Sequence, residues 1–202
     1  MELSTTVTKK GRINVSADGE YLFTVPAFIW YRSPLSSKTE ADAEELEDLK
    51  AEGFFADAEE KAMRLLSLRA HSEGELRRKL ARTVPGETAD AVIEELREKG
   101  YLDDEAFARD LAEELFRRKA YGPERIRLEL LNRGISAAVV TKTLESLDID
   151  KNTGIINSIR KMHLPETLTK KEADKVIRRL LNAGYSLADV REALDFTPME
   201  DC

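Results

Sequence analysis

The chain is almost free of cysteine. Its one cysteine is Cys202, so no disulfide can form within the chain, and a cysteine-based zinc site is disfavoured. Such sparse use of cysteine is typical of a reducing compartment. The first ten residues lack the apolar core of a signal peptide, and no later apolar run approaches the roughly 20 residues that span a bilayer. We therefore expect a cytoplasmic protein with no membrane partner.

Aromatic side chains and catalytic motifs are scarce too. Aromatic residues make up 6% of the chain, against 42% hydrophobic and 35% charged residues, which favours helices with charged surfaces over a β-sandwich or barrel. The sequence lacks the glycine-rich phosphate loop, the dinucleotide fingerprint and the His-Glu-x-x-His zinc motif. We therefore expect no cofactor, no metal and no small-molecule substrate.

The few residues that could carry catalysis have simpler explanations. The two histidines, His71 and His163, each lie close to a predicted helix end, where a polar boundary residue is commoner than a catalytic base. Asp103 and Asp104 resemble a carboxylate pair, but adjacent acids at a helix start are better explained by capping and by the helix dipole. We therefore predict that this protein works by binding and is not an enzyme.

Negative charge is concentrated near the N-terminus. The net charge is −7, and residues 1–60 hold 6 basic and 13 acidic side chains. Residues 61–133 hold 16 basic and 15 acidic side chains, and residues 134–202 hold 10 and 11. A basic face can therefore exist beyond residue 60 without showing in the total charge.

The N-terminal segment has the pattern of a β-hairpin. Residues 12–16 and 21–25 alternate or run apolar around Asp18 and Gly19, which are typical turn residues. Pro26 ends the second run, and a polar connector follows it. Residues 40–60 are acidic with few apolar positions, which predicts a short amphipathic helix and then a joint.

A fixed offset of 50 residues runs through the rest of the chain. Leu76, Ile126 and Val176 lie 50 residues apart. Residues 130–136 (LLNRGIS) and 180–186 (LLNAGYS) are identical at five of seven positions. Such an offset indicates that one helical unit is used repeatedly.

The shared heptamer contains a helix stop and a helix start. Gly134 and Gly184 can adopt the left-handed conformation that ends a helix. Ser136 and Ser186 can then accept hydrogen bonds from the free amides of the next helix. Other helix starts carry similar signals, namely Ser72 with Glu75, Thr169 with Glu172, Gly122 with Pro123, and Asp103 or Asp104 after Gly100.

These signals predict an all-α array of three tandem three-helix repeats, preceded by a small N-terminal β-hairpin element. We expect the hairpin and the acidic helix in residues 1–55, and one repeat each in 56–101, 102–149 and 150–202. The expected helices are 58–70, 73–83 and 88–99, then 104–119, 123–133 and 137–147, then 152–163, 170–183 and 187–195.

Lys and Arg recur on or near the middle helix of each repeat. Lys171, Lys175, Arg178 and Arg179 have the spacing of one helical stripe, which can contact phosphates or an acidic protein. The alternative is that these cations offset helix dipoles and pair with nearby Glu residues, but their recurrence favours a contact. The contact candidates are Arg77, Arg78, Lys79, Arg82, Arg117, Arg118, Lys119, Arg125, Lys175, Arg178 and Arg179.

Aromatic residues lie among these cations. They could form stacking platforms for nucleic-acid bases, although aromatics at helical spacing more often belong to the core. The residues in question are Tyr101, Phe107, Phe116, Tyr121 and Tyr185.

The order and spacing of several segments resemble the RecX family of recombinase regulators over nearly the whole chain. No short motif among them is specific by itself. The third repeat resembles the family less closely than the others. The matching segments are residues 11–15 and 18–21 near the N-terminus, 62–69 and 72–80 in the first repeat, and 100–108 and 121–130 in the second.

This resemblance implies a regulatory protein that binds RecA, lodges in the groove of the RecA–DNA filament and inhibits its recombinase and coprotease activities during the DNA-damage (SOS) response. It implies that DNA alone is bound only weakly. A three-helix unit can also act as an independent helix-turn-helix DNA-binding module. A helical scaffold for some other protein is a third alternative.

Overall fold

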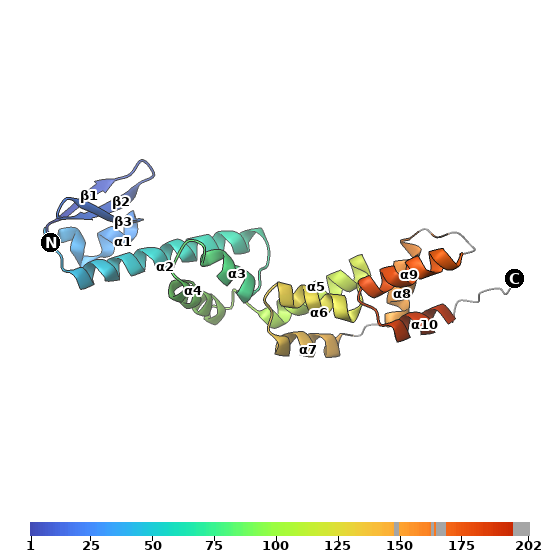
Figure 1. Ribbon diagram of the computed structural model, residues 1–202. Coiled ribbons are helices and arrows are strands. Elements are labelled where there is room, and N and C mark those ends of the chain that lie inside the picture. The colour runs from blue at the N-terminus through green and yellow to red at the C-terminus, as the bar shows by residue number, and fades with distance from the viewer. Residues whose placement is uncertain (148–149, 163, 165–168, 196–202) are drawn as a thin grey trace. The chain divides into compact units, whose positions relative to one another are not determined.

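The computed structural model describes residues 1–147, 150–162, 164 and 169–195. The chain forms two compact units, Met1–Leu102 and Asp103–Cys202, and both are mainly helical (Figure 1). Within the described ranges, no helix combines the length and the apolarity needed to cross a membrane. His163 and Cys202 lie outside the described residues.

The N-terminal element is an antiparallel sheet in the order β1-β2-β3, formed by Leu3–Val7, Arg12–Ala17 and Glu20–Pro26. The predicted hairpin corresponds to β2 and β3, and its turn places Asp18 and Gly19 in the left-handed region, with φ of 50° and 81°. Strand β1 was not predicted, because its polar sequence buries little and carries no period-2 apolar signal.

A single long helix, α2 (Ala43–Leu68), connects the sheet to the first repeat (Figure 1). It follows two short elements, α1 (Ala27–Arg32) and the 3₁₀ helix η1 (Pro34–Ser37). The predictions of a joint after a short acidic helix, and of a new helix starting at residue 58, are therefore wrong. The physical reason is that residues 43–68 contain no proline and consist mostly of good helix formers.

The first half of α2 packs against the sheet. Gly53 permits the approach, since a Cβ at that position would lie 2.5 Å from Cγ1 of Val25 on β3. Arg12 on β2 donates two hydrogen bonds to the Asp57 carboxylate, at 2.6 and 2.7 Å. A glycine that appears unfavourable inside a helix is thus a close-packing position.

The second half of α2 belongs to the first repeat, with α3 (Glu73–Leu80) and α4 (Gly86–Glu98). Its separate core contains Ala58, Ala62, Leu76, Leu80 and Leu96. Small alanines on α2 let the two shorter helices pack closely upon it.

The second unit contains the other two repeats, each with a core of its own. The offset positions Ile126 and Val176 are buried in these two cores. Apart from the first helix, every predicted helix has ends within three residues of the observed ones. The second repeat consists of α5 (Asp104–Lys119), α6 (Pro123–Asn132) and α7 (Ala137–Ser146), and the third of α8 (Lys151–Arg160), α9 (Lys170–Asn182) and α10 (Leu187–Asp195).

The predicted stops and starts are confirmed. Gly100, Gly134 and Gly184 have φ of 75°, 87° and 92°. Ser136 accepts a hydrogen bond from the Val139 amide at 3.3 Å, and Asp103 caps α5. Thr169 and Glu172 form a complete capping box at the start of α9.

The second and third repeats are joined by direct backbone contact. The Gly122 amide donates to the Ala183 carbonyl at 2.8 Å, and the Glu124 amide donates to the Gly184 carbonyl at 3.3 Å. The buried Tyr185 hydroxyl donates to the Ala120 carbonyl at 3.1 Å, and burial raises the pKa of Tyr185 to about 12. The glycine stop of the third repeat therefore also serves as its docking surface.

Candidate partner interface on the basic helices

In the first repeat, the predicted cations are largely engaged with their own unit. The Nε atom of Arg77 lies 2.5 Å from the Asp90 carboxylate on α4, and the Nζ atom of Lys79 lies 2.8 Å from Nε2 of His71. Arg78 and Arg82 are both exposed. Arg82 forms no ion pair with a described residue, so it is the cation of this cluster that is best placed to meet a partner.

His71 is a buried boundary residue, as predicted. Its side chain is 4% exposed, and Nδ1 lies 3.0 Å from the Arg69 carbonyl. Since a carbonyl only accepts, Nδ1 must carry the proton, and Nε2 is then free to accept from Lys79. Burial lowers the pKa of His71, and the charges of Arg69 and Lys79 lower it further.

Replacing His71 with glutamine is expected to reduce the loss of stability in acid. The folded state holds His71 with a lowered pKa, whereas the unfolded chain protonates near pH 6.5. Its contribution is therefore complete above about pH 6.5 and is lost as the pH falls through the folded pKa. Urea unfolding at about pH 7.5 and pH 5.5 measures this, and an equal pH dependence in both proteins would contradict it.

In the second repeat, the predicted cations sit in a mixed-charge surface. Arg117 and Arg118 lie 3.3 and 3.4 Å from Glu113 and Glu114, one turn earlier on α5. Arg125 lies 2.9 Å from Glu129. These exposed pairs lower the local positive potential, although each contributes little to stability.

Lys119 and Arg125 both lie against one aromatic ring. The Lys119 Nζ atom and the Arg125 Cζ atom are each 5.5 Å from the centroid of Tyr121, which is the geometry of a cation–π contact. Tyr121 is itself partly buried against the core of the second repeat. These two cations are therefore held in place beside the joint between repeats.

The third repeat differs from the others. Lys171, Lys175, Arg178 and Arg179 are exposed on α9, and none of them forms an ion pair with a described residue. The opposite side of the helix buries Val176 and Leu180. We name these four cations the basic face of α9 (for the helix, see Figure 1).

The acidic residues of α9 leave this face largely positive. Glu172 is engaged in the capping box with Thr169, where it accepts from the Thr169 amide at 2.9 Å, and Asp174 is exposed. Lys170 adds an exposed cation at the start of the helix. Lys170 was missed because it lies outside the i, i+4 spacing of the stripe.

The aromatic residues mostly belong to the core. Phe107, Phe116 and Tyr121 pack partly buried against the second repeat's core, and Tyr185 is 3% exposed. Tyr101 is 54% exposed and is the only one of the five that could serve as an open stacking surface. In the described part of the chain, no group of His, Cys, Asp and Glu is arranged to hold a metal ion.

Comparisons with known proteins agree on one family. The model for the first three-helix domain of RecX matches residues 58–96, and the model for the second matches residues 103–144. "Regulatory protein RecX" of Escherichia fergusonii is 39% identical over 146 residues, covering 66% of this chain and 87% of the relative. The protein of the same name from Escherichia coli K12 is 40% identical with the same coverage.

Two solved structures share the fold. A crystal structure of regulatory protein RecX superimposes with a TM-score of 0.66 at 22% identity, covering 96% of this chain and 98% of that one. RecX from Lactobacillus salivarius gives a TM-score of 0.59 at 17% identity, with coverage of 71% and 96%. The two domain models and the Escherichia relatives, together with this fold, show that the chain belongs to the RecX family of regulatory proteins.

Proposed function

We propose that this protein regulates the RecA recombinase by binding the RecA–DNA filament in its groove and inhibiting recombinase and coprotease activity. It acts in the cytoplasm during the DNA-damage response and has no catalytic activity of its own. The proposal is supported by membership of the RecX family and by relatives that are named regulatory proteins.

The observation that carries the proposal to particular residues is the unpaired charge of α9. Lys175, Arg178 and Arg179 are exposed without a described ion-pair partner, so the cost of breaking existing pairs is absent when an anion arrives. Cations of this kind bind phosphates by releasing counterions, or they steer toward acidic protein surfaces. Arg82 provides a similar unpaired cation in the first unit.

Tandem repeats suit a partner that is itself repetitive. Each of the three repeats has its own core, so each can offer a contact surface without depending on the others for its packing. Several weak contacts along one filament then add up to tight binding, because the second contact is intramolecular. We keep the division into 1–55, 56–101, 102–149 and 150–202 as part of this proposal.

A pull-down on RecA filaments tests the proposal. Filaments are assembled with single-stranded DNA and a non-hydrolysed ATP analogue, and free RecA and free DNA serve as controls. We expect enrichment on the filament, little binding to DNA alone, and slower strand exchange and repressor cleavage when the protein is added. Absence of enrichment on the filament would reject the proposed function.

The basic face of α9 also supports a second candidate, an independent DNA-binding module. In that case the protein would bind DNA without RecA, at an affinity equal to that for the filament, and the logarithm of the binding constant would fall steeply with the logarithm of salt concentration. The same pull-down separates the two candidates, because the free-DNA arm is then as strongly enriched as the filament arm.

A further inference from the structure

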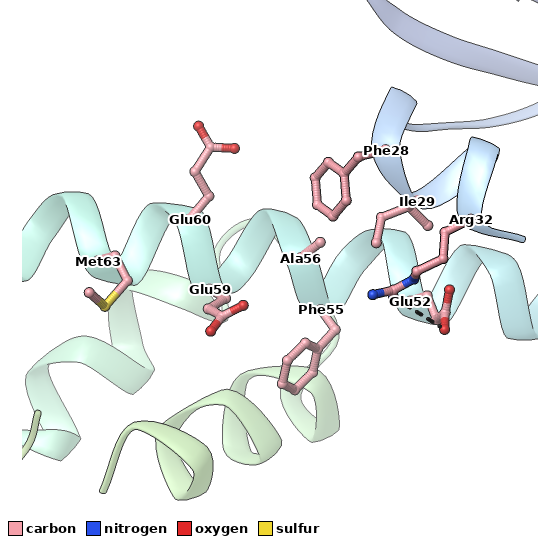
Figure 2. A pocket seen from close by; sticks show the side chains of 9 residues that line it. All are labelled: Phe28, Ile29, Arg32, Glu52, Phe55, Ala56, Glu59, Glu60 and Met63. Carbon is pink, nitrogen blue, oxygen red and sulfur yellow. Dashed lines mark ion pairs between the residues drawn. The ribbon is translucent and has the colours of Figure 1, made fainter. Parts of the chain in front are cut away.

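An open groove of about 650 Å³ lies between α1 and α2 in the first unit (Figure 2). Its apolar lining includes Phe28 from α1 and Phe55 and Met63 from α2. Phe28 is 61% exposed and Met63 is 37% exposed. Large apolar side chains that stay in water beside a concave surface are typical of a binding site, and methionine adapts readily to different partners.

Carboxylates border this apolar strip. Glu52, Glu59 and Glu60 line the groove along α2, and Arg32 is the one cation in the lining. Arg32 lies 3.6 Å from Glu52 across the groove, with both side chains more than half exposed. Glu59 lies 3.2 Å from Lys99 on the neighbouring helix α4, whereas Glu60 forms no ion pair with a described residue. The exposed pairs are weak and can be exchanged for pairs with a partner.

The acidic border continues beyond the groove. An adjoining hollow shares Arg32 and Glu52 with it and adds Glu45 and Asp48 from the same side of α2. The surrounding segment, residues 1–60, has 13 acidic side chains against 6 basic ones. A positively charged ligand is therefore attracted to this end of the molecule, whereas nucleic-acid phosphates and anionic lipid are repelled.

We propose that the groove between α1 and α2 binds an amphipathic helix of a partner protein, with apolar anchors on one face and Lys or Arg beside them. The apolar anchors would pack on Phe28, Phe55 and Met63, and the cations would meet Glu52 and Glu60. From residue 52 to residue 63, α2 rises about 16 Å, which matches about three turns of a bound helix. This surface is separate from the basic face of α9 and does not rest on the function proposed above.

The probe is a fluorescein-labelled synthetic peptide of about twelve residues, with two leucines four positions apart and lysines on the flanking positions. A matched peptide carries Glu in place of every Lys. Fluorescence anisotropy is measured with the full-length protein, without RecA or DNA. We expect the lysine peptide to bind and the glutamate peptide not to bind, with affinity falling as salt is added. We also expect the Met63 methyl resonance to shift on addition of the lysine peptide.

Two variants locate the binding site. Phe28→Ala is expected to weaken peptide binding about tenfold, as for the loss of a central aromatic contact, and Glu60→Lys is expected to weaken it further. Tyr31→Ala is the matched control, because Tyr31 is a 67% exposed aromatic on the same helix that does not line the groove. Circular dichroism checks that all three variants stay folded.

Three outcomes overturn the proposal. The first is that neither peptide binds, or that both bind equally. The second is that Phe28→Ala and Tyr31→Ala weaken binding to the same extent. The third is that sedimentation shows a dimer of the protein that Phe28→Ala dissociates, in which case the groove holds a second copy of this chain. RecA binding is measured in none of these arms, so their failure leaves the proposed RecA function standing.

Discussion

Replacing Gly184 with alanine is expected to destabilise the second unit by about 3 kcal/mol or more and to separate its two repeats. The residue has φ of 92°, where a side chain costs about 1–2 kcal/mol. An added Cβ would also lie 2.3 Å from the Arg125 amide nitrogen, and such overpacking typically costs a further 1–3 kcal/mol. Urea unfolding, with hydrogen exchange at the Gly122 and Glu124 amides, measures both effects.

Two other glycines separate the causes. Gly100 has φ of 75° but has open space where a Cβ would be, so Gly100→Ala isolates the conformational cost of about 1–2 kcal/mol. Gly122 has φ of −79°, yet its Cβ would lie 2.5 Å from the Gly184 carbonyl, so Gly122→Ala isolates the clash. Equal losses for Gly184→Ala and Gly100→Ala would show that the joint between repeats adds nothing to stability.

Neutralising the basic face of α9 is expected to weaken binding to RecA filaments about 10- to 100-fold. The variant is Lys175→Gln, Arg178→Gln and Arg179→Gln combined. If each cation meets a phosphate, the slope of log K against log salt becomes shallower by about 3, because about one counterion is released per contact. Co-sedimentation with filaments at several salt concentrations gives both quantities, and strand-exchange inhibition should fall in parallel.

The matched control removes three cations that already have local partners. Arg117→Gln, Arg118→Gln and Lys119→Gln change the same total charge, but Arg117 and Arg118 pair with Glu113 and Glu114, and Lys119 lies over Tyr121. We expect this variant to bind within a few-fold of wild type. Equal losses in the two variants would mean that total charge matters and that the basic face of α9 has no special role.

The repeat architecture was predictable because its signals are local. Gly134 and Ser136 act on their own helix ends, and the same chemistry recurs at Gly184 and Ser186. The continuity of α2 was not predictable in this way. Gly53 reads locally as an interruption, and only its contact with Val25, 28 positions earlier on a strand, explains why glycine fits there.

The candidate interface was only partly predictable. The pairs Arg117–Glu113 and Arg118–Glu114 follow from i, i+4 spacing. By contrast, Arg77 meets Asp90 on another helix, and Lys79 meets His71, so sequence spacing does not indicate which cations are engaged. The groove beside α1 left no signal, because a helix of six residues is too short to show a period.

The uninterrupted course of α2 has a consequence for where the first repeat begins. The matching family model begins at residue 58, inside a helix whose N-terminal cap is Asp42 and whose first half packs on the sheet. A fragment cut at that residue would lose the cap and more than half of the helix that supports α3 and α4. The N-terminal sheet is therefore an anchor for the first repeat, and damage to either one reaches the other through a shared backbone.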